Sequence, residues 1–150
     1  MNTKHIVLDS SVALKWELRD EEAIFAADQI LTDAISRKLD LIVPTLFDYE
    51  IANALKIAVT KERINAVRAE SALADFRLLP INRVDFSPFQ DLAFQLAMQH
   101  GRSVYDSAYM ALAQKRNNWF FTGDRRLFNA VGQELSWVKW IGDYQFELVP

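Results

Sequence analysis

The fold of this chain is decided near its start by the stretch IVLDSSVAL, residues 6–14. Three apolar residues, two of them β-branched, predict a short buried strand over residues 6–8. Asp9, Ser10 and Ser11 follow, and all three are residue types that favour the beginning of a helix. The stretch therefore predicts a strand that passes directly into a helix, with a carboxylate at the junction.

The rest of the chain repeats this alternation of strands and helices. From Glu21 to Arg37, apolar residues recur every three or four positions, which predicts an amphipathic helix. Pro44 suits the end of a strand, Pro88 the first turn of a helix and Gly101 the end of that helix. The other expected strands are about 41–43, 81–84, 119–122 and 137–141, and the other expected helices are about 46–60, 64–79, 88–99, 106–116 and 124–130. Such alternation predicts an α/β fold, in which a parallel sheet of about five strands is covered on both faces.

The composition favours a single domain over residues 1–150. The four Gly and four Pro are scattered, so neither a linker nor an internal repeat is visible. The absence of Cys excludes disulfides, thiolate nucleophiles and zinc–thiolate sites. No signal-peptide pattern is visible, and no apolar run approaches the roughly twenty residues that a membrane span requires. We therefore expect a soluble, cytoplasmic protein with no membrane partner.

The charge balance offers no general attraction for a polyanion. Twenty acidic and seventeen basic residues give a formal net charge of -3, so any contact with nucleic acid has to be local. Lys15, Arg102 and Arg125 lie close in sequence to acidic residues and are weak candidates for binding substrate. The alternative for each is an ordinary solvated surface charge.

Two acidic residues stand where predicted strands end. Asp9 follows the first strand and Asp124 lies one Gly beyond the strand at 119–122. In an open parallel sheet the functional crevice lies at the carboxyl ends of the strands. If these two strands are neighbours, both carboxylates lie on one rim. The alternative is that each Asp only caps the helix that follows it.

Two further acidic residues lie within predicted helices beside apolar neighbours. Glu50 has Leu46 and Phe47 one turn before it, and Asp106 has Tyr109 and Met110 one turn after it. A buried carboxylate is usually paired or bound to a metal, because desolvation alone costs several kcal/mol. Alternatively, Glu50 bonds a Tyr or Arg, and Asp106 caps its own helix.

Four carboxylates at four element boundaries suit Mg²⁺ or Mn²⁺, which prefer oxygen ligands. Such an ion can activate water and stabilise the hydrolysis of a phosphodiester. Competing chemistries lack their residues. The two histidines, His5 and His100, form no H-E-x-x-H motif, and no Walker or Rossmann glycine pattern is present. The aromatic run Trp119-Phe120-Phe121 is more typical of a sheet core than of a base-stacking surface.

Several motifs in order resemble those of the PIN-domain ribonucleases, and in particular the VapC-type toxins of toxin–antitoxin pairs. They span most of the chain. They are Val7-Leu8-Asp9-Ser10-Ser11, Glu50 with Asn53-Ala54-Leu55, Tyr105-Asp106-Ser107-Ala108-Tyr109 with Ala111-Leu112-Ala113, and Phe121-Thr122-Gly123-Asp124.

The resemblance implies a three-layer α/β/α domain that cleaves RNA endonucleolytically with Mg²⁺ or Mn²⁺. It implies a homodimer and a small antitoxin that covers the acidic pocket. Ser10 or Ser11 and Thr122 would supply hydroxyls near the metal or a phosphate, and Asn53 would brace the site by hydrogen bonding. The metal-binding and catalytic acids would be Asp9, Glu50, Asp106 and Asp124.

Three alternatives stay open beside this interpretation. The same nuclease chemistry could serve RNA processing without an antitoxin. The chain could instead be a non-catalytic interaction domain whose acids bind a basic segment of a partner. A phosphate-transfer receiver domain ranks lower, because it requires paired acids after the first strand and Asp9 is followed by Ser10 and Ser11.

Overall fold

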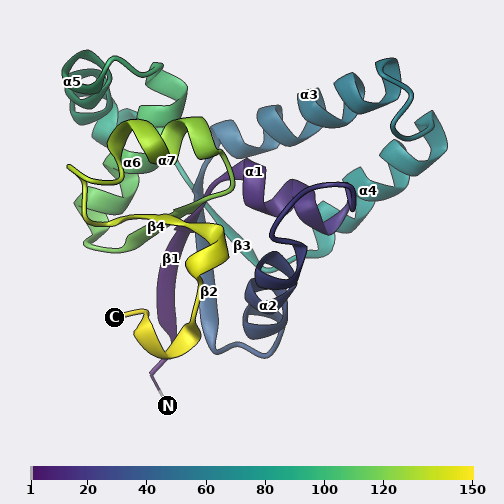
Figure 1. The fold of residues 1–150 in the computed structure, drawn as a ribbon, viewed down its shortest axis with the longest axis horizontal. Helices are drawn as coiled ribbons and strands as arrows, with labels where there is room; N and C mark the ends of the chain where they lie inside the picture. The colour runs from purple at the N-terminus through teal and green to yellow at the C-terminus, as the bar shows by residue number, and fades with distance from the viewer. Residues whose placement is uncertain (1) are drawn as a thin grey trace.

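A computed structural model describes residues 2–150, which are built around one five-stranded sheet. All of its pairings are parallel and the strand order is β3-β2-β1-β4-β5. The strands are β1 (Lys4–Leu8), β2 (Leu39–Pro44), β3 (Ile81–Val84), β4 (Trp119–Thr122) and β5 (Val138–Trp140). The expected α/β fold with five parallel strands is therefore confirmed (Figure 1).

Helices cover both faces of the sheet and make three layers. Along β1, Ile6 and Leu8 pack in one core cluster and Val7 packs in another, because successive strand residues face opposite sides. The first cluster lies under α1 to α4 and the second under α5 to α7 (Figure 1). The helices are α1 (Ser10–Ala13), α2 (Ile24–Ile35), α3 (Leu46–Thr60), α4 (Ala66–Leu78), α5 (Gln90–His100), α6 (Val104–Arg116) and α7 (Arg125–Val131), and the short 3-10 turns are η1 (Leu14–Trp16), η2 (Ser87–Phe89), η3 (Ile141–Asp143) and η4 (Phe146–Leu148). No helix among these residues is long and apolar enough to cross a bilayer.

Three helices, α2, α4 and α5, begin two or three residues later than the sequence pattern predicts. The helix expected from Glu21 begins at Ile24, after Ala23 in the left-handed conformation. In the loop before α2, Asp20 and Glu21 form ion pairs with Arg63, which comes later in the chain. These ion pairs involve a residue about forty positions away, so local periodicity does not reveal them. Similarly, Pro88 lies in η2, and α5 starts two residues later.

The sheet order brings together two segments that are far apart in sequence. β1 pairs with β4 in a register that places Leu8 opposite Phe121. The backbone N–H of Asp9 continues this ladder by donating to the carbonyl of Phe121 at 3.0 Å. The residues that follow β1 and β4 therefore share one rim, at the carboxyl ends of the central strands.

The C-terminal aromatic segment completes the core on the α2 side of the sheet. Tyr144 packs edge-on against Phe121 with 5.3 Å between ring centroids. Its hydroxyl donates to the buried carboxylate of Asp33 on α2 at 2.8 Å. Burial raises the pKa of Tyr144 above its ordinary value, so the phenol keeps its proton and acts as the donor.

We predict that Tyr144→Phe lowers the free energy of unfolding by about 1–3 kcal/mol, because a buried carboxylate loses its side-chain donor while the ring is kept. Urea denaturation measures the change. Tyr105→Phe is the matched control, since Tyr105 is exposed and its hydroxyl bonds no residue from 2 to 150. An unchanged urea midpoint for Tyr144→Phe would contradict the prediction.

Candidate active site

Asp9 is the buried acid at the end of β1, with only 7% of its surface exposed. The hydroxyl of Thr122, at the end of β4, donates to its Oδ2 at 2.7 Å. Asp9 occupies the N-cap position of α1, yet its side chain accepts no helix N–H. Helix capping therefore does not explain this carboxylate. Its oxygens face the neighbouring strand end and the rim instead.

Glu50 reaches the same rim from α3. Its Oε1 accepts hydrogen bonds from the hydroxyl of Tyr109 at 2.6 Å and from Ser10 Oγ at 3.2 Å. These bonds connect α3 to α6 and to the first residue of α1. The alternative that Glu50 bonds a Tyr is therefore confirmed, and the bond also orients the carboxylate beside Asp9, which Ser10 contacts at 3.4 Å.

Asp106 lies in the first turn of α6 and does not cap it. Ser103 is the N-cap, and its Oγ accepts the backbone N–H of Asp106 at 3.0 Å. Oδ2 of Asp106 pairs instead with the guanidinium of Arg102 at 3.1 Å. The interpretation of Asp106 as a cap is wrong because Ser103, three residues earlier, fills that role. The S-x-x-D spacing is the sequence signal that identifies it.

Asp124 does cap a helix. Its Oδ1 accepts the backbone N–H groups of Arg126 at 2.9 Å and Leu127 at 3.3 Å, at the start of α7. Its own backbone N–H donates to Thr122 Oγ1 at 3.0 Å. The capping interpretation is therefore confirmed for Asp124. Thr122, which also holds Asp9, ties the two acids to the same strand end.

Small residues let the two strand ends approach closely. Ser11 Oγ accepts the backbone N–H of Gly123 at 2.9 Å and lies 3.5 Å from Thr122 Oγ1. A Cβ at Gly123 would lie 2.7 Å from Cε of Lys15 and 3.1 Å from the carbonyl oxygen of Ser11. A side chain at Gly123 would therefore crowd Lys15 and the backbone of α1, which would have to shift.

Burial and like charges act together on the acids at this rim. Burial, more than any other cause, raises the pKa of Asp9 from 3.8 to about 7. The Thr122 hydrogen bond opposes the shift, whereas the charges of Glu50 and Asp106 add to it. Burial also raises the pKa of Glu50, against its bonds from Tyr109 and Ser10. Asp9, Glu50 and Asp106 therefore form one electrostatic cluster.

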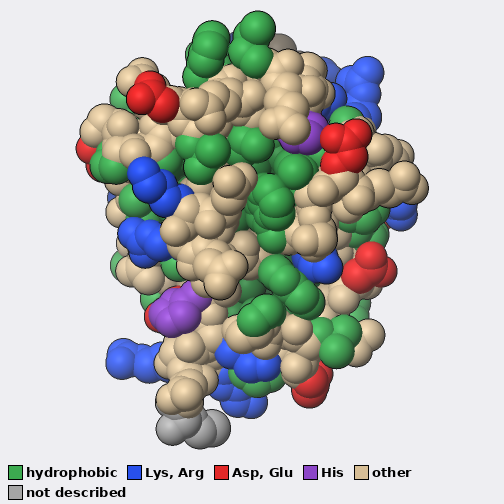
Figure 2. Space-filling view, turned by 90° about the vertical axis from the view of Figure 1, so that its left-hand side faces the viewer, with side chains coloured by type: hydrophobic (Ala, Val, Ile, Leu, Met, Phe, Trp, Pro, Cys, Tyr) green, Lys and Arg blue, Asp and Glu red, His purple; other side chains and the backbone are tan. Residues whose placement is uncertain are grey.

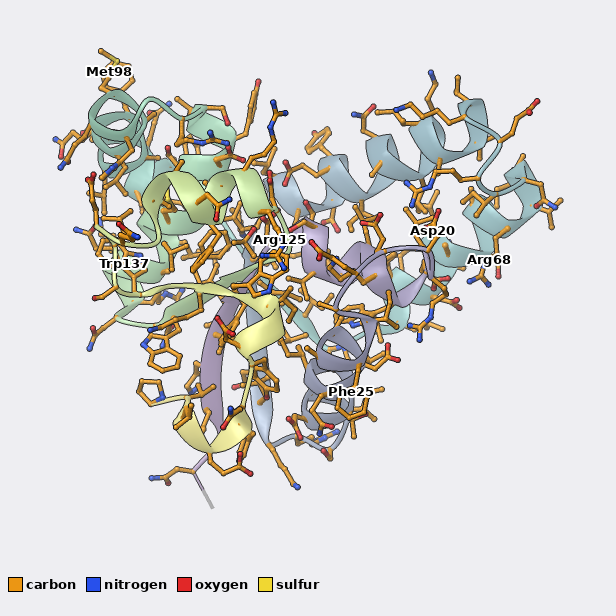
Figure 3. The ribbon with its side chains drawn as sticks, viewed as in Figure 1. Asp20, Phe25, Arg68, Met98, Arg125 and Trp137 are labelled. Carbon is orange, nitrogen blue, oxygen red and sulfur yellow. The ribbon has the colours of Figure 1, made fainter. Side chains whose placement is uncertain are left out.

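The three candidate substrate-binding cations are all engaged within the chain. Arg102 pairs with Asp106. Arg125 pairs with Glu22 at 2.9 Å and stacks 4.2 Å over the Trp140 ring, near the centre of Figure 3. Lys15 is 1% exposed, and burial lowers its pKa. The alternative of a solvated surface charge is therefore wrong for Lys15.

Asn53 does not brace the rim in this structure. The side chain is exposed on α3, and it makes no hydrogen bond to any residue between 2 and 150. Tyr109 and Ser10 hold Glu50 instead. No sequence pattern indicates the role of Tyr109 as the donor to Glu50; its position one turn after Asp106, on the same face of α6, is the available signal.

The donor chemistry of the cluster fits a hard divalent cation. Its carboxylates and hydroxyls are oxygen ligands of the kind that Mg²⁺ and Mn²⁺ prefer, and burial of like charges favours a bound positive charge. Over residues 2–150, however, no three acidic or histidine side chains converge as a ready-made metal site. Asp106 faces Arg102 and Glu50 faces Tyr109, so binding an ion requires side-chain rotation.

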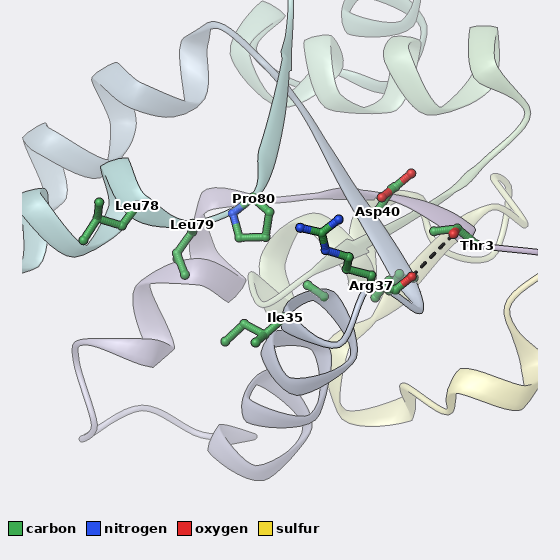
Figure 4. Close-up of a pocket in the computed structure, with 9 residues that line it drawn as sticks. Thr3, Ile35, Arg37, Asp40, Leu78, Leu79 and Pro80 are labelled. Atoms are coloured by element: carbon green, nitrogen blue, oxygen red, sulfur yellow. Dashed lines mark hydrogen bonds between the residues drawn. The ribbon is translucent and has the colours of Figure 1, made fainter.

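A hollow of about 640 Å³ lies at the opposite end of the sheet, where β2 begins. Figure 4 shows it between the end of α2 and the segment 78–80 that precedes β3. Its walls are mainly apolar, with Arg37 and Asp40 as the charged lining residues. No predicted site residue lines it, so its volume does not mark the reactive site.

Comparisons with known proteins agree with the architecture. The family described as PIN domain matches residues 6–133. Ribonuclease VapC12 of Mycobacterium tuberculosis is 30% identical over 127 residues, which cover 85% of this chain and 92% of that protein. The crystal structure of PAE2754 from Pyrobaculum aerophilum superposes with a TM-score of 0.65 at 20% identity and covers 93% of this chain and 90% of that one. DNA-bound VapBC from Salmonella typhimurium gives a TM-score of 0.59 at 14% identity, covering 93% and 99%.

In the absence of metal, we predict that Asp9 makes the protein less stable as the pH rises from about 4 to about 7. Its folded pKa is raised to about 7, so the native state binds the proton more tightly than the unfolded chain does. This contribution is complete below about pH 4 and is lost as pH rises through about 7, by roughly 4 kcal/mol at most.

Urea denaturation in a chelator at pH 5 and pH 8 tests this expectation. Asp9→Asn should flatten the pH dependence, whereas Asp91→Asn, at an exposed acid on α5, should leave it unchanged. A parent protein equally stable at both pH values would contradict the assignment.

Proposed function

The chain belongs to the PIN-domain family, and we propose that it is a metal-dependent endoribonuclease that acts as the toxin of a toxin–antitoxin pair. The observation that carries the proposal is the buried carboxylate of Asp9, whose pKa is raised by burial and by the charges of Glu50 and Asp106. Perturbed acids gathered at the carboxyl end of a parallel sheet are typical of reactive sites. The related ribonuclease VapC12 supports RNA as the substrate.

In this proposal Asp9, Glu50, Asp106 and Asp124 hold Mg²⁺ or Mn²⁺. Such an ion, when bound, supplies an activated water and stabilises negative charge on the phosphodiester. Thr122 fixes Asp9 by donating to Oδ2. Asp124, two residues after Thr122, is fixed by the amides of Arg126 and Leu127 at the start of α7. Ordered carboxylates of this kind lose little entropy when they bind.

The remaining polar groups control orientation and charge. Tyr109 and Ser10 donate to Glu50 and keep one of its oxygens directed at the rim. Arg102 balances Asp106 and is the cation best placed to contact a phosphate once that acid turns to an ion. Lys15 and Arg125 have a lesser role in this proposal, because Lys15 is buried and Arg125 is paired with Glu22.

We further propose that a small antitoxin covers the acidic rim and that the chain forms a homodimer in the cytoplasm. The likeness to VapBC and the resemblance to the VapC-type toxins of toxin–antitoxin pairs support a protein partner. The acidic cluster would suit a basic side chain of that partner. For the homodimer, α5 offers exposed apolar side chains at Phe94 (58%) and Met98 (71%), the latter at its outer end in Figure 3. Figure 2 shows hydrophobic side chains gathered on this side of the molecule.

Two alternative functions differ from this proposal in the partner or the chemistry that they require. An RNA-processing nuclease keeps the same chemistry but has no antitoxin, so a short neighbouring reading frame for a DNA-binding protein favours the toxin. A non-catalytic interaction domain needs neither metal nor cleavage. The raised pKa of Asp9 favours an enzyme over that rival, because a surface for a basic partner does not require a buried acid.

Asp9→Asn and Asp106→Asn should each lower RNA cleavage by at least about a hundredfold, because each removes a negative ligand from the site. Both substitutions keep the side-chain shape, so circular dichroism should remain that of the parent. Gel analysis of a labelled single-stranded RNA with Mn²⁺ measures the rate. Asp91→Asn serves as the control and should cleave normally. A variant at Asp9 that cuts at the parent's rate would exclude the mechanism.

Calorimetric titration with Mn²⁺ should show saturable uptake by the parent and weaker or no uptake by Glu50→Gln. The substitution removes one negative charge while Tyr109 can still donate to the amide oxygen. Asp91→Asn should bind as the parent does. No detectable uptake by the parent would favour the non-catalytic interaction domain.

A further inference from the structure

Two tyrosines stand exposed beside the acidic rim. Tyr49 on α3 is 78% exposed and Tyr105 on α6 is 64% exposed. Each immediately precedes a rim acid, Glu50 or Asp106, but adjacent residues on a helix project in different directions. Neither hydroxyl makes a hydrogen bond to another residue between 2 and 150, and neither ring contributes to the two core clusters. Folding therefore leaves both rings available.

The two rings line the same hollow, which has a volume of about 440 Å³. The other side chains that line it are mostly apolar: Leu46, Phe86, Val104 and Ala108. Ligand pockets of this size commonly combine such walls with a few polar groups at one edge. Here, the polar groups are Thr45 and the two tyrosine hydroxyls, and the rim acids Glu50 and Asp106 each follow one of the tyrosines in sequence.

The helical spacing places this hollow directly beside the acids. Leu46 lies one turn before Glu50 on α3, and Tyr105 lies one turn before Tyr109 on α6. The bond from Tyr109 to Glu50 connects these two helices at 2.6 Å. The hollow and the acid cluster therefore both lie where α3 and α6 meet.

The charge distribution limits how this rim can hold an RNA strand. The net charge is -3, and the nearby cations Arg102 and Arg125 each pair with an acid. Attraction for phosphates is therefore weak beside the site. Exposed aromatic faces are a further source of affinity there, because every nucleobase has a π-face that can stack on tyrosine.

We propose that Tyr49 and Tyr105 form a stacking subsite for an unpaired nucleobase of the RNA strand that is cut. This inference rests on the proposed ribonuclease function and adds the class of RNA to it. A base in a duplex is already stacked and paired, so only a base in a single strand, loop or bulge can enter the hollow. The subsite would place the neighbouring phosphate at the acids.

The test uses the cleavage-deficient Asp9→Asn protein, so that binding is measured without turnover. Fluorescence anisotropy with a labelled single-stranded RNA compares Tyr49→Ala and Tyr105→Ala with Tyr49→Phe and Tyr105→Phe. Each Ala variant should raise Kd about tenfold or more, because a stacking ring is lost. The Phe variants, which keep the ring, should stay within about twofold. The matched control is Phe25→Ala on α2, where an 83% exposed ring is removed from another helix, and it should bind like the parent.

Three results would overturn the subsite. The first is unchanged affinity in both Ala variants, and the second is no measurable RNA binding by Asp9→Asn. The third is a change of oligomeric mass, by light scattering, with unchanged affinity per protomer, which would make the surface an interface between copies of the chain.

Cleavage by the parent is assayed in parallel. If the parent cleaves RNA and the Ala variants bind normally, the nuclease stands without this subsite. If the parent does not cleave but the tyrosine dependence holds, the subsite stands without the nuclease.

Discussion

The hydrogen bond from Thr122 to Asp9 is the interaction on which the arrangement of the site depends. It joins the ends of β1 and β4, which are neighbours in the sheet but more than a hundred residues apart in the chain. A buried carboxylate without a donor would be strongly unfavourable. The bond makes the burial of Asp9 tolerable, and Gly123 leaves room for Ser11 and Lys15 beside the end of β4. The pairing of β1 with β4, which brings Thr122 beside Asp9, is therefore what allows this carboxylate to be buried.

The other acids reach the rim from separate layers, and different groups compensate each of them. Tyr109 and Ser10 supply neutral donors to Glu50, whereas Asp106 has the guanidinium of Arg102. Neutral donors stabilise a carboxylate without cancelling its charge, so repulsion from Glu50 still reaches Asp9. One arginine is the direct counter-charge for three clustered carboxylates. That imbalance favours the binding of a positive group at the rim, whether an ion or the basic side chain of a partner.

Sequence patterns predicted the local part of this structure well. The run of apolar residues before Asp9 identified the strand–helix junction, and the spacing of Asp124 identified a cap that the structure confirms. Strand pairing could not be read from these patterns, because it depends on contacts between distant segments. The same limit applies to the loop before α2, which Arg63 holds from another layer. It also applies to Lys15, which is buried and lies beside Gly123, more than a hundred residues away in the chain.

The role expected for Asn53 illustrates how a motif and a structure differ. A motif gives the order of residue types, but the rotation of α3 is set by the apolar side chains Phe47, Ile51 and Leu55, which are buried against the sheet. Glu50 lies at the edge of that buried face, within reach of Tyr109. Asn53 lies farther around the helix, in solvent. The packing of α3 therefore selects which polar residue joins the rim, and a neighbour in the same motif can be left outside it.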